Sequence, residues 1–319
     1  MPAHLNSPWW LPGAHLQTIY PLLRKPPPLP LRRQQLDTPD GDFLELDWLD
    51  GAPDAAPLLI LFHGLEGSSN SHYARSLLHA CRQRGWRCVV VHFRGCSGRP
   101  NRLARAYHSG DSAEIGWIIE SLAGHRNSAP LVAAGVSLGG NALLKWLGEQ
   151  EQEAQRWLDA AVAICPPLDL TISGHALSRG FNRIYIHHFL GTLKPKALEK
   201  LERFPGLFER ERLLRARTLH AFDDVFTAPV HGFAGADDYW QRASSRPWLR
   251  GIRLPTLLLT TANDPFVPAQ ALPSAAECSP QLRHEHASSG GHVGFVTGSF
   301  PGTLDWLAQR TIGFVSQAR

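Results

Sequence analysis

Short apolar runs alternate along the chain with stretches whose apolar residues recur every three or four positions. Continuous apolar runs of five to eight residues are typical of parallel strands buried on both faces, and the second pattern is typical of amphipathic helices. The pattern predicts strands at 57–62, 86–93, 130–136, 159–165, 255–261 and 282–287, an alternating, half-buried strand at 43–49, and helices at about 71–84, 111–124, 139–149, 195–203 and 302–316.

Strands that alternate with helices in this way indicate an α/β protein with a mostly parallel central sheet flanked by helices. Most of the apolar runs end in a turn with polar residues, such as His63-Gly64, Ser137 and Asn263-Asp264. In open parallel sheets the ligand site lies beyond the carboxyl ends of the strands. We therefore expect the functional residues at these turns.

Two stretches interrupt the alternation. Residues 166–250 are rich in Arg, His, Phe and Pro and contain no clear apolar strand, which predicts a helical cap inserted into the sheet. Residues 1–42 contain two adjacent tryptophans and a proline run, which predicts an extended arm that wraps the domain. The expected organisation is arm 1–42, core 43–165, cap or lid 166–250 and core 251–319.

Composition narrows the class of protein. With 319 residues, 43% of them hydrophobic, the chain is globular rather than disordered. Its net charge of +4 is small and its arginines are scattered, so we expect no nucleic-acid partner. Five cysteines without a CxxC pair favour a reduced, cytoplasmic protein. No signal peptide or spanning apolar stretch is visible, so we expect no stable membrane insertion.

The strongest motif is Gly-Val-Ser-Leu-Gly at 135–139. This G-x-S-x-G sequence lies between an apolar strand and a predicted helix, which is the setting of a nucleophile elbow. The elbow strains the serine backbone and leaves no room for Cβ atoms at the neighbouring turns, so glycine is needed there. We predict that Ser137 is the nucleophile.

A serine nucleophile needs a base and an acid that orients the base. Position selects His292, in a Gly-rich loop after the last predicted strand, and Asp264, at the end of strand 255–261. The resulting order of Ser137, Asp264 and His292 is the order that this strand–helix architecture uses for such a triad, and the long first gap accommodates a cap. The four aspartates at 223, 224, 237 and 238 fall in the cap and are weaker candidates for the acid.

Two backbone N–H groups are expected to stabilise the oxyanion. One belongs to Leu138, directly after the nucleophile, and the other to Leu65 in the His63–Gly67 sequence HGLEG. We expect His63 to brace this loop rather than react. Glu66 either organises the loop through hydrogen bonds or is simply solvated.

The pattern favours no metal and no cofactor. His284 and His286 share one strand face, but no third ligand lies near them in the sequence. Cys96 follows an arginine and a glycine but no motif supplies it with a base, and the Walker pattern of a phosphate loop is missing.

Several motifs together resemble one family. They are GAHLQT (13–18), HGLEGSS (63–69), FRGCSG (93–98), YHSGD (107–111), GVSLGGN (135–141), FDD with TAPVHGF (222–233), DPFVP (264–268) and GGHVGF (290–295). This set, which spans nearly the whole chain, resembles the YheT-like branch of the α/β-hydrolases, also called the AB-hydrolase 4 group. The resemblance implies the α/β-hydrolase fold and a Ser-Asp-His triad at Ser137, Asp264 and His292. Family members commonly have Asp-Asp-Pro at the acid, where this chain has Asn263-Asp264-Pro265.

The resemblance implies a serine carboxylic-ester hydrolase for short- to medium-chain acyl esters that works through an acyl-enzyme. The expected partner is a small acyl ester, and the oligomeric state is not readable from the sequence. An acyltransferase with the same triad and a non-catalytic binding protein are the alternatives. Some eukaryotic relatives act on lipids and carry an N-terminal membrane segment. This chain shows none, so we expect poor turnover of long-chain insoluble lipids.

Overall fold

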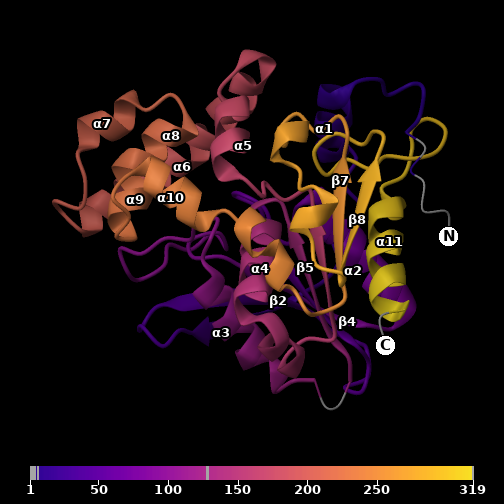
Figure 1. Cartoon of the computed structure of the whole chain (residues 1–319). Helices are drawn as coiled ribbons and strands as arrows, with labels where there is room; N and C mark the ends of the chain where they lie inside the picture. The colour runs from indigo at the N-terminus through magenta and orange to yellow at the C-terminus, as the bar shows by residue number, and fades with distance from the viewer. Residues whose placement is uncertain (1–4, 6, 127–128, 318–319) are drawn as a thin grey trace.

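The computed structural model describes residues 5, 7–126 and 129–317. Its centre is an eight-stranded sheet with the order β1-β2-β4-β3-β5-β6-β7-β8 (Figure 1). The pairs β1·β2 and β2·β4 are antiparallel, and the strands from β4 to β8 run parallel. The strands are β1 (Arg32–Asp37), β2 (Phe43–Leu49), β3 (Leu58–Phe62), β4 (Arg87–His92), β5 (Leu131–Val136), β6 (Ala160–Ile164), β7 (Thr256–Thr261) and β8 (Leu282–Ala287).

Helices cover both faces of the sheet. On one face α3 (Ser112–Ala123) and α4 (Leu138–Gln150) pack on one apolar core, and on the other α2 (His72–Arg84) and α11 (Asp305–Gln317) pack on a second. The central strands contribute to both cores, because alternate residues point to opposite faces. This double burial explains why their sequences are continuously apolar. The predicted α/β fold with a mostly parallel sheet is confirmed.

Between β6 and β7 the described chain is helical and contributes no strand to the sheet. This helical segment, called the cap below, lies on the left of Figure 1. Its residues Leu213, Phe222 and Phe226 belong to a third apolar core, which Phe266 and Val267 after β7 complete. The main elements of the cap are α5 (Leu170–Leu177), α6 (Arg183–Arg203), α7 (Arg210–Arg215), α8 (Leu219–Phe222), a π-helical turn (Asp223–Thr227), α9 (Ala228–Val230) and α10 (Ala236–Ala243).

The longest cap helix, α6, begins twelve residues before the predicted helix at 195–203. Proline is favoured in the first turn of a helix and disrupts its interior, so Pro195 locally favours a helix start. The helix nevertheless runs through Pro195, and its first half buries Ile186 and Leu190 in the third apolar core. Tertiary packing therefore outweighs the local signal here.

The expectation that the arm is wholly extended is wrong. Residues Ala14–Leu23 form helix α1, whose Gln17, Thr18 and Pro21 are buried, and Arg32–Asp37 form edge strand β1. The proline-rich stretch between them and residues 7–13 before α1 lie outside helices and strands. The helix forms because its buried side packs against a loop near the end of the chain, a contact that the local sequence does not reveal.

Candidate active site

The predicted nucleophile lies at a sharp turn between β5 and α4. Ser137 has φ 52° and ψ −116°, a conformation that non-glycine residues rarely adopt. Its flanking glycines allow the turn, because a Cβ atom at Gly135 would lie 2.5 Å from the carbonyl oxygen of Gly139, and one at Gly139 would lie 2.6 Å from that of His63. The strain and the crowding are those that G-x-S-x-G implies.

The structure brings together the three residues that the sequence predicts for the triad. The Nε2 atom of His292 lies 3.0 Å from Ser137 Oγ, and its Nδ1 atom lies 2.8 Å from Asp264 Oδ2. Asp264 is buried and His292 nearly so, while Ser137 is half-buried. The hydroxyl, imidazole and carboxylate thus form one hydrogen-bonded chain with its serine end toward solvent.

The carboxylate of Asp264 is oriented by its own turn. Its Oδ1 atom accepts hydrogen bonds from the backbone N–H groups of Phe266 (2.8 Å) and Val267 (3.2 Å), which leaves Oδ2 for the imidazole. Asn263, which stands where relatives commonly have aspartate, faces away: its amide donates to Gln17 Oε1 and accepts from the Gly291 backbone N–H. The acid predicted next to the proline is the one that contacts the histidine.

The HGLEG loop, residues 63–67, packs against the nucleophile turn. A Cβ atom at Gly64 would lie 3.3 Å from Ser137 Cβ, so the loop approaches the serine closely. The Leu138 N–H is in the first turn of α4 and therefore has no acceptor within the helix. Among the described residues, the Leu65 N–H also has no acceptor. Both predicted donors are thus available for a ligand oxygen.

His63 has the bracing position that we expected. Its Nδ1–H donates to the Gly64 carbonyl (2.7 Å), and its Nε2 accepts the Phe93 N–H (3.1 Å). The side chain is completely buried, and burial lowers its pKa to about 3. His63 therefore stays neutral, which its role as donor at one nitrogen and acceptor at the other requires.

Glu66 organises the loop rather than being solvated. Its N–H donates to the Tyr107 hydroxyl (3.0 Å), which in turn donates to Glu66 Oε1 (2.8 Å). The ammonium of Lys196, from the cap helix α6, lies 2.8 Å from the second carboxylate oxygen. Glu66 also has a left-handed backbone with φ 55°. The cap is thus tied to the residue that follows Leu65.

Sequence reasoning missed the part played by the arm. The hydroxyl of Thr18 accepts the His292 N–H (2.9 Å), and Gln17 Oε1 accepts the Gly290 N–H (2.8 Å). His72, on α2, lies 2.9 Å from the Val293 carbonyl through Nε2. The GAHLQT motif indicates the family but not this contact, since no periodicity or spacing in the sequence links residue 18 with residue 292.

Only one set of three described residues has atoms close enough to suggest a metal site: Cys165, Asp264 and His292. The imidazole and carboxylate of this set already bond to each other, and burial holds the pKa of the Cys165 thiol well above its ordinary value. A thiol must be deprotonated to bind a metal. These residues fit a hydrogen-bonded chain better than a metal centre.

The remaining candidates have structural partners. His284 and His286 both hydrogen-bond to Thr260 Oγ1, at 2.8 Å each. Burial raises the pKa of Cys96 to about 12, and its sulfur lies 3.9 Å from both Glu66 Oε1 and Lys196 Nζ. A thiol with so high a pKa is a poor nucleophile at neutral pH.

Comparison with known proteins agrees with this architecture. Residues 57–299 match the family model described as alpha/beta hydrolase fold. The chain is 40% identical to "Putative esterase YheT" of Escherichia coli (strain K12) over 93% of its length and 88% of the relative's. It is 29% identical to human "Phospholipase ABHD3" over 92% of its length and 73% of the relative's. The Pyrococcus furiosus esterase Pf2001 superposes with a TM-score of 0.56 at 15% identity, over 92% of this chain and 99% of that one.

Proposed function

Because the chain belongs to the α/β-hydrolase family, as a carboxylic-ester hydrolase of its YheT-like branch, we propose that it hydrolyses short- to medium-chain acyl esters through a covalent acyl-enzyme. Ser137 is the nucleophile, His292 the general base and acid, and Asp264 the residue that orients the imidazole. The observation that carries the proposal is the continuous hydrogen-bonded chain from Ser137 Oγ through His292 to Asp264.

The reaction proceeds in two halves. Ser137 Oγ attacks the ester carbonyl carbon while His292 Nε2 takes its proton, and the C–O bond to the alcohol breaks as the same nitrogen returns that proton to the leaving oxygen. Water then attacks the acyl-serine, and His292 transfers the water proton to Ser137 as the acid leaves. Asp264 keeps Nδ1 protonated and stabilises the imidazolium formed in each half.

The N–H groups of Leu65 and Leu138 stabilise the oxyanion of each tetrahedral intermediate. Such donors act where charge develops, so their effect is largest in the transition state. Their availability and the close approach of the HGLEG loop to Ser137 support this assignment.

Aromatic side chains on the cap side of the triad support an acyl substrate. The ring of Phe266 lies 4.2 Å from that of His292, and Tyr185 and Phe189 of α6 contact Phe266 at centroid distances of 4.7 and 6.2 Å. Each methylene buried in such surroundings contributes about 0.8 kcal/mol. We therefore expect kcat/KM to rise several-fold with each added methylene up to medium chain lengths.

The test uses p-nitrophenyl esters of increasing acyl length and a fluorophosphonate probe. Ser137→Ala should lower turnover by about three orders of magnitude or more and abolish probe labelling, while the circular dichroism spectrum stays unchanged. Ser289→Ala, a serine of the histidine-bearing loop that bonds only to Ser7, is the matched control and should retain activity. Labelling at another serine would contradict the nucleophile assignment, and rates independent of acyl length would contradict the acyl-chain preference.

A further inference from the structure

We propose that the molecule docks reversibly on lipid bilayers that contain anionic phospholipids, through an apolar face beside the candidate active site. Seven of the nine large apolar side chains that are exposed in the described structure belong to the arm, the turn before α6 with the start of that helix, and the loop before α11. We call this set the apolar face: Trp9, Leu16, Leu22, Leu23, Phe181, Ile184 and Phe300.

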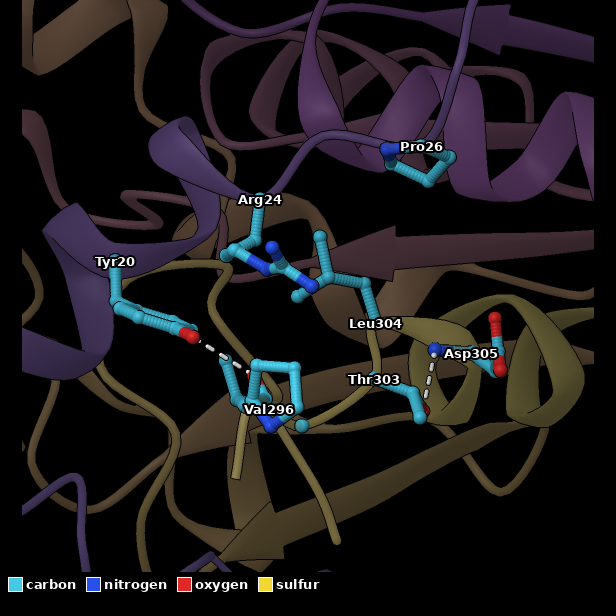
Figure 2. A pocket seen from close by; sticks show the side chains of 9 residues that line it. Tyr20, Arg24, Pro26, Val296, Thr303, Leu304 and Asp305 are labelled. Carbon is cyan, nitrogen blue, oxygen red and sulfur yellow. Dashed lines mark hydrogen bonds between the residues drawn. The ribbon is translucent and has the colours of Figure 1, made fainter. Parts of the chain in front are cut away.

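Side-chain contacts join the three segments into one surface. The ring of Trp10 lies 5.4 Å from that of Phe300 and 5.3 Å from that of Tyr20, and on the other side of α1 the ring of His15 lies 4.3 Å from that of Phe181. The Tyr20 hydroxyl donates to the Pro301 carbonyl at 2.8 Å, and it lines a cavity of about 170 Å³ together with Arg24 (Figure 2). Helix α1 is thus the centre of the face.

The exposed residues of α1 occupy one side of the helix. Leu16 and Leu23 are seven residues apart and so lie one above the other, whereas Gln17, Thr18 and Pro21 occupy the buried side. Leu23 is 77% exposed, Phe300 74% and Trp9 91%. A clustered set of exposed apolar side chains marks an interaction site, while scattered ones need no explanation.

The charge of these segments identifies the partner. Residues 1–36, 170–198 and 286–304 contain no Asp or Glu, although the whole chain has 28. Arg24 and Lys25 follow α1, and Arg179 and Arg183 flank Phe181; all four are exposed and form no ion pair with any described residue. The exposed carboxylate nearest in sequence to a residue of the apolar face is that of Asp305, five residues after Phe300. It lines the same cavity as Arg24 (Figure 2).

An apolar patch bordered by cations, with an exposed tryptophan, fits the interface of an anionic bilayer. Each basic residue near such a surface gains about 1 kcal/mol from the anionic headgroups. A second copy of the chain is a poorer occupant, because its own four cations would face these four across the contact. Surface docking also needs no spanning helix, and the described residues include no helix long and apolar enough to be one.

The apolar face is linked to the candidate site by packed side chains. His15 lies 3.1 Å from the Tyr185 hydroxyl, and Tyr185 contacts Phe266, which packs on His292. Aromatic side chains thus connect α1 to the proposed base. The docking proposal rests on the proposed function and extends it, because the substrates then include acyl esters presented at a lipid surface. It revises the expectation that a chain without a membrane segment turns lipids over poorly.

The test separates docking from catalysis by using the full chain with Ser137→Ala. This protein should float with vesicles of phosphatidylcholine and phosphatidylglycerol, and much less with phosphatidylcholine alone. The double variant Leu16→Gln, Leu23→Gln should lower its partition coefficient by about tenfold or more, and so should Arg24→Glu with Lys25→Glu. Leu214→Gln, on the cap, and Arg156→Glu, before β6, are the matched controls and should bind as the parent does.

Failure to bind the anionic vesicles would overturn the proposal, and so would an equal loss in the two controls. Self-association that depends on Leu16 and Leu23, without vesicle binding, would show that a second copy covers the face and would also overturn it. Hydrolysis of a soluble p-nitrophenyl ester by the parent enzyme without vesicles reports on the proposed function alone. Vesicle binding with no soluble esterase activity would leave docking supported and the esterase proposal refuted.

Discussion

Two loops at the carboxyl edge of the sheet flank Ser137, and they are held in different ways. The histidine loop, residues 288–295, carries His292, and the HGLEG loop carries Leu65. A buried histidine contacts each one: His72 at the Val293 carbonyl and His63 at the Gly64 carbonyl. Beyond this shared feature, the histidine loop depends on the arm and the HGLEG loop depends on the cap.

The arm holds the histidine loop through buried, uncharged contacts. Gln17 and Thr18 are both buried and accept N–H groups of the loop, and a Cβ atom at Gly294 would lie 2.1 Å from the Gln17 carbonyl oxygen. These contacts leave little freedom, because dense packing resists displacement. The proposed base is therefore positioned by the rigid part of the molecule.

The cap holds the HGLEG loop through a charged pair that water reaches. The side chain of Lys196 is 41% exposed where it meets Glu66. Burial works to lower the pKa of this lysine, but Cys96 and Glu66 outweigh it and leave the pKa raised, so the ammonium stays charged. A partly exposed ion pair is weak and adjustable. Cap movement can therefore displace the Leu65 N–H, the proposed oxyanion donor, more readily than His292, the proposed base.

Lowering the pH should cause the largest loss of stability, because acid opposes the burial of the neutral histidines, His63 and His72, that contact the two loops. Burial lowers the pKa of His63 to about 3 and that of His72 to about 4, whereas histidines in the unfolded chain titrate near 6.5. Below that pH the unfolded chain binds more protons than the native protein, so stability falls as pH falls. We expect the two together to cost about 5 kcal/mol of unfolding free energy between pH 6 and pH 4.

Urea unfolding at a series of pH values measures this loss. His72→Gln should flatten the pH dependence by about half of the predicted slope, and His79→Gln, a half-buried neighbour on α2 whose Nε2 lies 2.8 Å from the Pro27 carbonyl, is the control. A slope that is the same in all three proteins would show that His72 does not control acid stability.

Gly294→Ala tests the close packing of the arm. The added methyl group cannot fit without moving the histidine loop or α1, so we expect a loss of about 2–3 kcal/mol in unfolding free energy together with a marked fall in kcat. Gly191→Ala, in α6, is the control, because a Cβ atom there meets no other atom within 4 Å. Unchanged stability and activity in Gly294→Ala would mean that the arm is not packed against the loop as described.

Thr18→Val removes both hydrogen bonds of the Thr18 hydroxyl, the one that it donates to the Ala14 carbonyl and the one that it accepts from the His292 N–H. Valine has nearly the same shape, so the main change is that the buried His292 N–H loses its acceptor, at a cost of about 1–2 kcal/mol. We expect kcat to fall about tenfold while KM changes little, since the loss affects the placement of the base rather than the binding of substrate. Thr18→Ser keeps the hydroxyl and should restore kcat. An equal deficit in both variants would indicate a packing effect instead.

Lys196→Met should have the smallest effect. The substitution breaks the ion pair with Glu66. Because the pair is partly exposed, it contributes only about 0–1 kcal/mol, so we expect kcat/KM to fall no more than about fivefold. Lys194→Met, two residues away and bonded only to the Leu214 carbonyl, is the matched control. A loss in Lys196→Met as large as that in Thr18→Val would show that the two loops are equally rigid.

The pH dependence of kcat/KM distinguishes the proposed base from its neighbours. A histidine base stops working when protonated, which for this side-chain type happens in mildly acidic solution. Because His63 and His72 have pKa values of about 3 and 4, neither titrates there. We therefore expect one dominant acid limb above pH 5, and a profile flat down to about pH 4 would contradict a histidine base.

The sheet and the triad candidates could be predicted from sequence because their signals are local. Buried parallel strands are continuously apolar over five or six residues, so β3 to β7 begin and end within one or two residues of their predicted bounds. Ser137 can be recognised in the sequence because its strained turn requires the flanking glycines. Asp264 and His292 follow because strands of a parallel sheet end at a common edge, which brings distant turns together.

The arm and the apolar face depended on tertiary structure. Nothing local in residues 13–18 indicates that Thr18 would accept the His292 N–H, because that bond spans 274 positions and exists only once α1 lies on the histidine loop. The exposure of Leu16 and Leu23 likewise depends on which side of α1 is buried. Local sequence is enough to predict the strands, the nucleophile turn and the order of the triad candidates, since each follows from short-range sterics and burial. Only the fold decided what braces the histidine and which apolar side chains stay exposed, because both depend on contacts between segments far apart in the chain.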